Sequence, residues 1–212
     1  QGCAQHSRLL PLMTTVLIAK SADEARAAKF SPKIVLCPEN PNIEGVSWNP
    51  TVLFDEALFK KCGEWIPEAH ARKTKHVAKI QTLALALAVE ANDSPIVILS
   101  ADVTPPDGWQ ERLTAALKDG VGMVAAVIPT GETKSIKAWR VGGKQILMRD
   151  DLDICPIEVG SAALDCCVLT VEAAKAIIPL SGHDLTEHEI GAKLAAANLR
   201  LMLHPLVRCL HG

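Results

Sequence analysis

Polar side chains follow three apolar runs of the sequence, at points where a buried strand would end. Ser100 and Asp102 come after one run, Glu39 after a second, and His211 after the last. In open α/β sheets, ligands bind beyond the carboxyl ends of the strands. A carboxylate and an imidazole at adjacent strand ends could ligate a divalent ion that holds phosphate oxygens. The alternatives are a turn cap before a double proline for Asp102 and a frayed end for His211.

A second group of charged side chains opens the longest helical stretch, residues 70–91. Arg72, Lys75 and Lys79 lie in its first half, where positive charge opposes the helix macrodipole. These cations either form a solvated face or meet an anion beside the helix. The second interpretation would place part of an anionic ligand near this helix.

The elements that must position these side chains begin with a strand, a helix and a second strand. Thr15–Ala19 is a short β-rich run, and Lys33–Cys37 is a second apolar run. Between them, Ser21 and Glu24 have the spacing of a capping box, which predicts the start of a helix. A strand, a helix and a strand within about 25 residues predict a parallel sheet.

The alternation continues to the end of the chain. Ile96–Leu99 has four consecutive apolar residues and is predicted to be a central strand buried on both faces. The segment 138–148 is typical of a hairpin with a Gly142-Gly143 turn. Further strands are predicted within 122–129, 159–170, 199–203 and 207–210, further helices within 51–62, 108–113, 171–178 and 186–198, and an irregular loop over 41–50. The predicted fold class is α/β, with a mixed, mostly parallel central sheet flanked by helices.

Composition sets limits on the function. The chain has 212 residues, of which 49% are apolar, so a sizeable core is expected. A net charge of −2 argues against a dedicated nucleic-acid binder, although it is compatible with a local basic patch. The seven cysteines form no Cys-x-x-Cys pair, which favours reduced thiols in a cytoplasmic protein. No apolar run reaches the roughly 20 residues that a membrane helix needs.

The first residues are interpreted separately from the domain. Residues 8–19 superficially resemble a signal peptide, which would make the protein secreted. The preferred interpretation is that Met13 is an internal start and that residues 1–12 are a leader or an expression remnant. Residues 13–212 would then form one domain, with a nucleotide-binding half over 13–110 and an acceptor and metal half over 111–212.

Four segments together resemble a known family. Leu99-Ser-Ala-Asp-Val-Thr-Pro-Pro-Asp-Gly-Trp109 resembles the "LDADVxPxxGW" strand and turn of GT-A fold glycosyltransferases. Residues 160–177, Gly-Ser-Ala-Ala-Leu-Asp-Cys-Cys-Val-Leu-Thr-Val-Glu-Ala-Ala-Lys-Ala-Ile, are similar to the family's "G…G(C/A)xLIRREVxEAI". Residues 186–194 resemble "EDTDLGLRL", and residues 198–211 resemble "G(Y/R)RIxxxPxVxxxH". The four occur in the family's order and cover the chain from about residue 14 to 211.

The resemblance implies sugar transfer from a nucleotide-sugar donor, a UDP- or GDP-sugar, with Mn²⁺ or Mg²⁺ bridging the diphosphate. Asp102 matches the metal-binding second Asp of the family's Asp-x-Asp, and His211 matches the metal-side His. Ser100 replaces the first Asp; a hydroxyl could still bond a ribose but adds no charge, so metal affinity would be weaker or the ion would arrive with the donor.

The other roles follow from the same resemblance. Glu187 matches the catalytic base of inverting members, with Asp184 or Glu189 as alternatives. Glu39 matches a residue that reads the nucleotide base, and the region of Arg72, Lys75 and Lys79 matches cations near the donor. Asp165 and Trp139 are expected to face the acceptor, although Asp165 could instead pair with a nearby cation. The equally open alternatives for the acids are turn residues and charges at a helix start.

Three other functions compete with this one. A nucleotidyltransferase is disfavoured because Ala19-Lys20-Ser21-Ala22-Asp23 carries no glycine after the first strand. A non-catalytic GT-A-like binding module is favoured by Ser100 and Thr186, which both stand where the family has acids. A retaining glycosyltransferase would need no base at Glu187. The sequence names neither the sugar nor the acceptor, which could even be a nucleic acid, and it does not indicate the oligomeric state.

Overall fold

A computed structural model of the chain describes residues 13–51, 67–130, 135–147, 154–183 and 185–211, with side chains except those of 67–72, 130, 135, 147 and 211. The helices are α1 (Ala22–Ala27), α3 (Pro67–Ala91), α4 (Trp109–Ala116), α5 (Val171–Ile177) and α6 (Thr186–Ala196). The strands are β1 (Thr14–Ile18), β2 (Ile34–Cys37), β3 (Ser47–Pro50), β4 (Ile96–Ser100), β5 (Val103–Thr104), β6 (Val121–Val127), β7 (Pro129–Thr130), β8 (Ser135–Trp139), β9 (Gln145–Leu147), β10 (Ile157–Glu158), β11 (Ser161–Ala162), β12 (Cys166–Leu169), β13 (Arg200–Arg208) and β14 (Leu210–His211).

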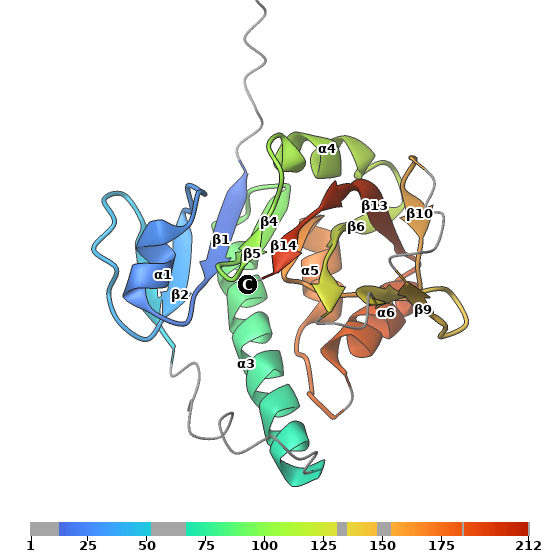
Figure 1. Ribbon diagram of the computed structural model, residues 1–212, viewed down its shortest axis with the longest axis horizontal. Coiled ribbons are helices and arrows are strands. Elements are labelled where there is room, and N and C mark those ends of the chain that lie inside the picture. Colours follow the sequence, from blue (N-terminus) through green and yellow to red (C-terminus); the bar gives the residue numbers. More distant parts are fainter. Residues whose placement is uncertain (1–12, 52–66, 131–134, 148–153, 184, 212) are drawn as a thin grey trace, which may run out of the picture.

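Within the described residues, eight strands form the central sheet in the order β10-β13-β6-β12-β4-β1-β2-β3 (Figure 1). Strands β3, β2, β1 and β4 are parallel, β13 is parallel to β6, and β12 is antiparallel to both of its neighbours. Two smaller sheets accompany it: β11-β8-β7 with β9 on β8, and β14 with β5. The predicted mixed, mostly parallel sheet flanked by helices is confirmed.

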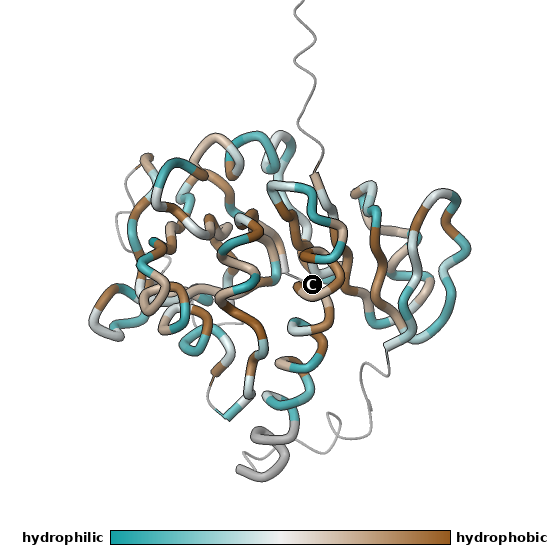
Figure 2. The backbone as a smooth tube through the Cα atoms, turned by 180° about the vertical axis from the view of Figure 1, so that it is seen from behind, coloured by the Kyte–Doolittle hydropathy of each residue, from teal (hydrophilic) through white to brown (hydrophobic). Residues whose placement is uncertain are grey.

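Helices cover both faces of the central sheet, and its inner strands β2, β1, β4, β12 and β6 bury side chains on both sides. In β1, Val16 packs in the core beneath α3, α5 and α6, whereas its neighbour Leu17 packs in the core beneath α1 and α4. Successive side chains of a strand point to opposite faces. Apolar strands therefore run through the interior, and polar residues lie mostly on the outer loops (Figure 2).

Local sequence signals set several element boundaries. Ser21 is the N-cap of α1 and accepts a hydrogen bond from the Glu24 amide at 3.1 Å. The predicted hairpin is present as β8 and β9, with Gly142 and Gly143 at φ +97° and +88°. Positive φ is readily adopted only by glycine, so these two residues make the turn possible. The predicted capping and hairpin are thus confirmed.

Two predicted boundaries differ from the structure. Ser47–Pro50 was expected in an irregular loop, but it forms the edge strand β3, paired in parallel with β2 and held by the Trp48 Nε1 hydrogen bond to Cys37 O at 3.1 Å. The last two strands were predicted over 199–203 and 207–210, but the structure has one long strand, β13 (Arg200–Arg208), followed by the short β14 (Leu210–His211). The register of β13 is irregular around Pro205, because proline has no N–H donor. The helix predicted over 51–62 lies outside the described residues, apart from Thr51.

Cys166 and Cys167 point to opposite faces of β12, as their adjacency predicts, and enter the two different cores. The described cysteines are free thiols. Among the described helices, none has the length and apolar character to cross a bilayer.

Candidate functional site

The carboxyl ends of β2, β1 and β4 lie side by side at one edge of the central sheet, because the three strands are parallel neighbours. Ile18 of β1 is in register with Ser100 of β4. The antiparallel strand β12 begins at the same edge, where the Ser100 amide donates to the Asp165 carbonyl oxygen at 2.7 Å. Ser100, Asp102 and Asp165 are therefore brought together from segments about 65 residues apart. We call this edge of the sheet the carboxyl edge.

Asp102 forms an ion pair with Lys20, and the residue after it pairs with strand β14. Its Oδ2 accepts a hydrogen bond from Lys20 Nζ at 2.8 Å, and its side chain is 22% exposed. Residue Val103 pairs with His211 across β5 and β14, so the backbone of His211 lies opposite the residue after Asp102. The sequence prediction that Asp102 and His211 lie at neighbouring positions is consistent with this backbone pairing, while the His211 side chain lies outside the described residues.

The donor set at Asp102 fits a divalent ion. A carboxylate and an imidazole suit Mn²⁺, and substrate phosphate oxygens commonly complete such sites. Lys20 already pairs with this carboxylate, so a metal ion would have to displace an ammonium group to bind Asp102 Oδ2. In the part of the chain that the structure describes with side chains, no group of three or more His, Cys, Asp or Glu side chains could hold a metal by itself. Further ligands would therefore have to come from His211 and from the substrate.

Asp165 forms the centre of a second polar group. It accepts hydrogen bonds from Lys137 Nζ at 2.5 Å and from Ser100 Oγ at 3.4 Å. Burial by itself would lower the pKa of Lys137, but the charge and hydrogen bond of Asp165, helped by the charges of Glu187 and Asp102, raise it above its usual value. Lys137 is therefore a fixed positive charge at the carboxyl edge, within the field of three carboxylates that come from different segments.

Sequence reasoning missed Lys137, although strand alternation could have indicated it. In β8, Ile136 and Ala138 are buried, while Lys137 and Trp139 share the opposite, half-buried side. Lys137 lies between two core residues of β8, so its side chain faces the same way as the Trp139 ring, but the hairpin was predicted to begin only at residue 138. Without the pairing of the sheets, nothing indicated that this side would face Asp165.

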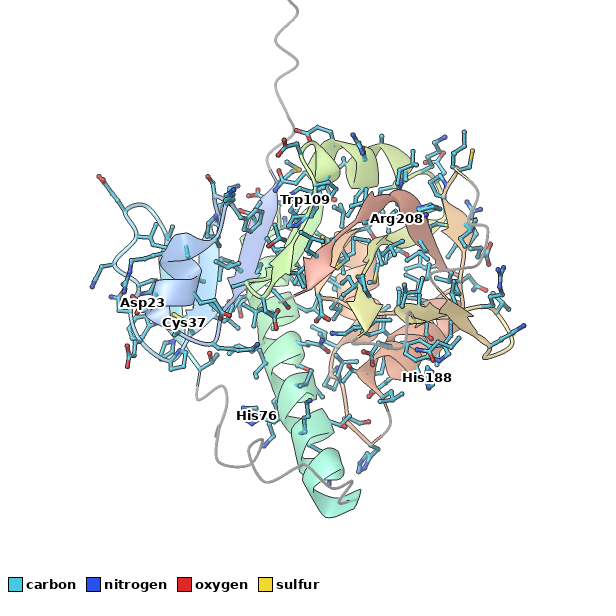
Figure 3. All side chains as sticks on the ribbon, viewed as in Figure 1. Asp23, Cys37, His76, Trp109, His188 and Arg208 are labelled. Atoms are coloured by element: carbon cyan, nitrogen blue, oxygen red, sulfur yellow. The ribbon has the colours of Figure 1, made fainter. Side chains whose placement is uncertain are left out.

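Helix α6 brings Glu187 to the same region. Glu187 lies in its first turn, accepts a weak hydrogen bond from Thr186 Oγ1 at 3.4 Å, and acts electrostatically on Lys137. The next residue, His188, which is labelled in Figure 3, packs edge-on against Trp139 with ring centroids 4.7 Å apart. The predicted base and the predicted acceptor-side aromatic therefore belong to one surface, formed by α6 and β8.

A close backbone approach sets the position of α6. A Cβ atom added to Gly191 would lie 1.8 Å from the carbonyl oxygen of Gly160, which precedes β11. Only glycine permits such proximity, so α6 packs directly on the strand that pairs with β8.

Glu189, an alternative base, has another task. It accepts hydrogen bonds from the amides of Ser181 and Gly182 at 2.8 Å and 3.2 Å, and Lys193 lies 3.6 Å away. Burial alone would raise its pKa, but the hydrogen bonds from Ser181 and Gly182 and the charge of Lys193 hold the pKa of Glu189 below its usual value. Glu189 therefore anchors the 181–182 loop and is a poor proton acceptor.

The remaining predicted residues are less closely placed. Glu39 follows β2 at the carboxyl edge and is exposed. Lys79 is exposed on α3, and no ion pair among the described side chains joins it to Asp102 or Asp165. The Arg72 side chain and all of Asp184 lie outside the described residues.

Comparisons with known proteins agree on the fold. No protein-family model matches the chain, and its sequence matches no curated protein. Among solved structures, protein A197 from STIV matches over 94% of this chain and 86% of its own, with a TM-score of 0.54 and 14% identity. GalNAc-T7, crystallised with UDP, GalNAc and Mn²⁺, matches over 96% of this chain with a TM-score of 0.54 and 11% identity. This chain spans 44% of the GalNAc-T7 chain, so the match concerns one part of that protein.

A third match, to a UTP-bound UGPase from Acinetobacter baumannii, has a TM-score of 0.49 and 8% identity over 94% of this chain and 88% of that one. At these identities the two matches with a TM-score of 0.54 establish the fold alone. The chain has the GT-A fold, as its sequence predicts.

Proposed function

We propose that this protein transfers a sugar, most simply a hexose, from a UDP- or GDP-sugar to an acceptor hydroxyl, with Mn²⁺ or Mg²⁺ bound at Asp102. The observation that supports this best is the carboxyl edge itself. Asp102, Asp165 and Glu187 come from separate segments, yet all three act electrostatically on Lys137, and Asp165 pairs with it directly. A fold with this edge is suited to a nucleotide ligand.

On the donor side, Asp102 and His211 would hold the ion. The ion would neutralise the charge that develops on the departing nucleoside diphosphate. Glu39, exposed after β2, is available to accept a hydrogen bond from the nucleotide base. Arg72 and Lys79 of α3 would act on the donor only at longer range, as part of a positive field.

Ser100 has a different role from the acid it replaces. Its hydroxyl donates to Asp165, which in turn holds Lys137. We therefore assign Ser100 to the support of this polar group, with its oxygen still able to accept a hydrogen bond from a ribose hydroxyl.

On the acceptor side, Glu187 would deprotonate the attacking hydroxyl, which makes the mechanism inverting. Trp139 offers a half-buried ring for the acceptor, on the same side of β8 as Lys137, which pairs with Asp165. Asp184 remains the second candidate for the base.

The location and the partners are proposals of the same kind. The described free thiols support a reducing, cytoplasmic location. The UDP and Mn²⁺ in the GalNAc-T7 crystals support UDP as the first nucleotide to test. The acceptor is left open, with small molecules, proteins, glycans and nucleic acids all in the test set.

A non-catalytic nucleotide or sugar-binding module is the second candidate. Ser100 and Thr186 stand where the resembled family has acids. Of the two acids in the first turn of α6, Glu189 anchors the 181–182 loop, which leaves Glu187. Such a module would bind the donor without turning it over.

A donor assay with Glu187→Gln distinguishes the two functions. UDP- and GDP-sugars are incubated with and without Mn²⁺, and released nucleotide is measured alongside donor binding. A transferase predicts Mn²⁺-stimulated release, with donor binding retained and release lowered by about 10²-fold or more in Glu187→Gln. Tight binding with no release from any donor would favour the module, and full activity of Glu187→Gln would contradict the assignment of the base.

A further inference from the structure

Lys20 is paired with the proposed metal ligand. Its Nζ lies 2.8 Å from Asp102 Oδ2, with 53% of the Lys20 side chain and 22% of the Asp102 side chain exposed. The pairing follows from register, because Ile18 and Ser100 are partners on parallel strands and each is followed two residues later by one member of the pair. Side chains at such matched positions lie next to each other.

The backbone around Lys20 is held on both sides. The Ala19 amide donates to Leu36 O at 3.0 Å, and the Ala101 amide donates to Ile18 O at 2.8 Å. The Lys20 amide itself donates to the Glu24 carboxylate at the start of α1. The backbone at Lys20 is therefore held in place, while its four-carbon side chain is 53% exposed and can adopt other rotamers.

We propose that Lys20 competes with the divalent ion for Asp102 and thereby makes metal binding depend on the nucleotide. This inference rests on the proposed function. Without ligand, the charges of Lys20 and Asp102 cancel. A divalent ion alone would have to displace the ammonium and would leave uncompensated positive charge at the carboxyl edge. A diphosphate that arrives with the ion removes this penalty, because the displaced ammonium can then contact a phosphate oxygen.

Charge at the neighbouring site reinforces the effect. Lys137 stays positively charged beside Asp165, and Asp102 lies within its field. Two ammonium groups thus act on the carboxyl edge before any ligand binds. A lone cation has to compete with an ammonium group for Asp102 or Asp165. A cation that arrives with a diphosphate does not leave the displaced ammonium unpaired, which is the condition for positive coupling between metal and diphosphate.

The test is a titration with Mn²⁺ alone, followed by the same titration in the presence of UDP. Free Mn²⁺ is measured by electron paramagnetic resonance for the wild type, Lys20→Met, Lys20→Arg and Lys33→Met. Lys33 offers a matched control: it pairs with Asp93 at 2.9 Å, with side chains 45% and 31% exposed, and the two residues precede β2 and β4 at the opposite edge of the sheet. Circular dichroism establishes that each variant is folded.

We expect Lys20→Met to bind Mn²⁺ alone about fivefold more tightly than the wild type, the scale of one exposed ion pair. In the same variant, UDP should increase Mn²⁺ affinity by a smaller factor than in the wild type. Lys20→Arg should retain the weak metal-only binding, and Lys33→Met should match the wild type.

Two results would overturn the inference. One is Mn²⁺-only affinity in Lys20→Met equal to or below that of the wild type. The other is tighter binding that persists when Asp102→Asn is added, since the metal would then bind elsewhere. Coupled binding of UDP and Mn²⁺ to the wild type, whatever the behaviour of Lys20→Met, would still support the proposed function. No UDP binding under any condition would contradict both.

Discussion

Gly191→Ala tests the packing that positions Glu187. The added Cβ would lie 1.8 Å from Gly160 O and 2.9 Å from Gly160 C. Ordinary carbon–oxygen contacts in proteins are about 3.3–3.6 Å. Both partners are backbone atoms, so rotation of a side chain cannot relieve the overlap. Helix α6 or the segment before β11 would have to move by more than about 1 Å.

Helix propensity alone predicts that Gly191→Ala stabilises the fold. Replacing a glycine inside a helix by alanine ordinarily stabilises a protein by about 0.8–1.0 kcal/mol. Overpacking ordinarily costs about 1–3 kcal/mol and occasionally more. Because the overlap at Gly191 involves rigid backbone, we expect the upper part of that range and a net destabilisation of about 2 kcal/mol. For a chain of this size, the midpoint temperature would fall by about 2–4 °C for each kcal/mol.

Urea unfolding followed by circular dichroism measures this change. Ala192→Gly, at the exposed neighbouring position of α6, is the control for propensity and should lose about 1 kcal/mol. If the protein is a transferase, Gly191→Ala should also lower transfer by about 10²-fold, since a displacement of about 1 Å near the base is enough. A Gly191→Ala protein as stable as the wild type would refute the close approach of α6 to Gly160.

Three further predictions concern charges. Lys137→Met and Asp165→Asn should each destabilise the fold by about 1–3 kcal/mol, and the double variant by clearly less than their sum; additive effects would show that the pair is not coupled. Burial lowers the pKa of His204 below its usual value of 6.5, so the fold favours the neutral ring and loses stability as acidification protonates it. Between neutral pH and about pH 5, His204→Gln should therefore lose less stability than the wild type, as measured by urea midpoints. An equal loss in the two proteins would contradict this. Glu189→Gln should speed hydrogen exchange at the Ser181 amide, and unchanged exchange would show that the carboxylate does not anchor the loop.

The sequence allowed the elements around the site to be predicted because their signals are local. Ser21 and Glu24 indicate the start of α1 within one turn, and the paired glycines at 142 and 143 indicate the hairpin turn. The position of Asp102 at a strand end follows from one apolar run and the turn residues after it. Such features depend on residues that are close in the chain, and they need no knowledge of which strands pair.

The contacts of the site could not be predicted in this way. The ion pair of Lys20 with Asp102 depends on the register of β1 with β4, and the contact of Lys137 with Asp165 depends on how the small sheet packs against the central one. Edge strand β3 was missed because its sequence, Ser-Trp-Asn-Pro, has no apolar alternation. The strand forms because it pairs with its neighbour β2.

The central claim is that the carboxyl edge binds a nucleoside diphosphate together with a divalent ion at Asp102. Calorimetric titration of UDP, and then GDP, in the presence of Mn²⁺ tests it on the wild type and Asp102→Asn, with Asp93→Asn as the control from the opposite ends of the strands. We predict Mn²⁺-dependent binding to the wild type and the control, weakened by about tenfold or more in Asp102→Asn. Equal affinity in Asp102→Asn, or no binding of either nucleotide to the wild type, would contradict the claim.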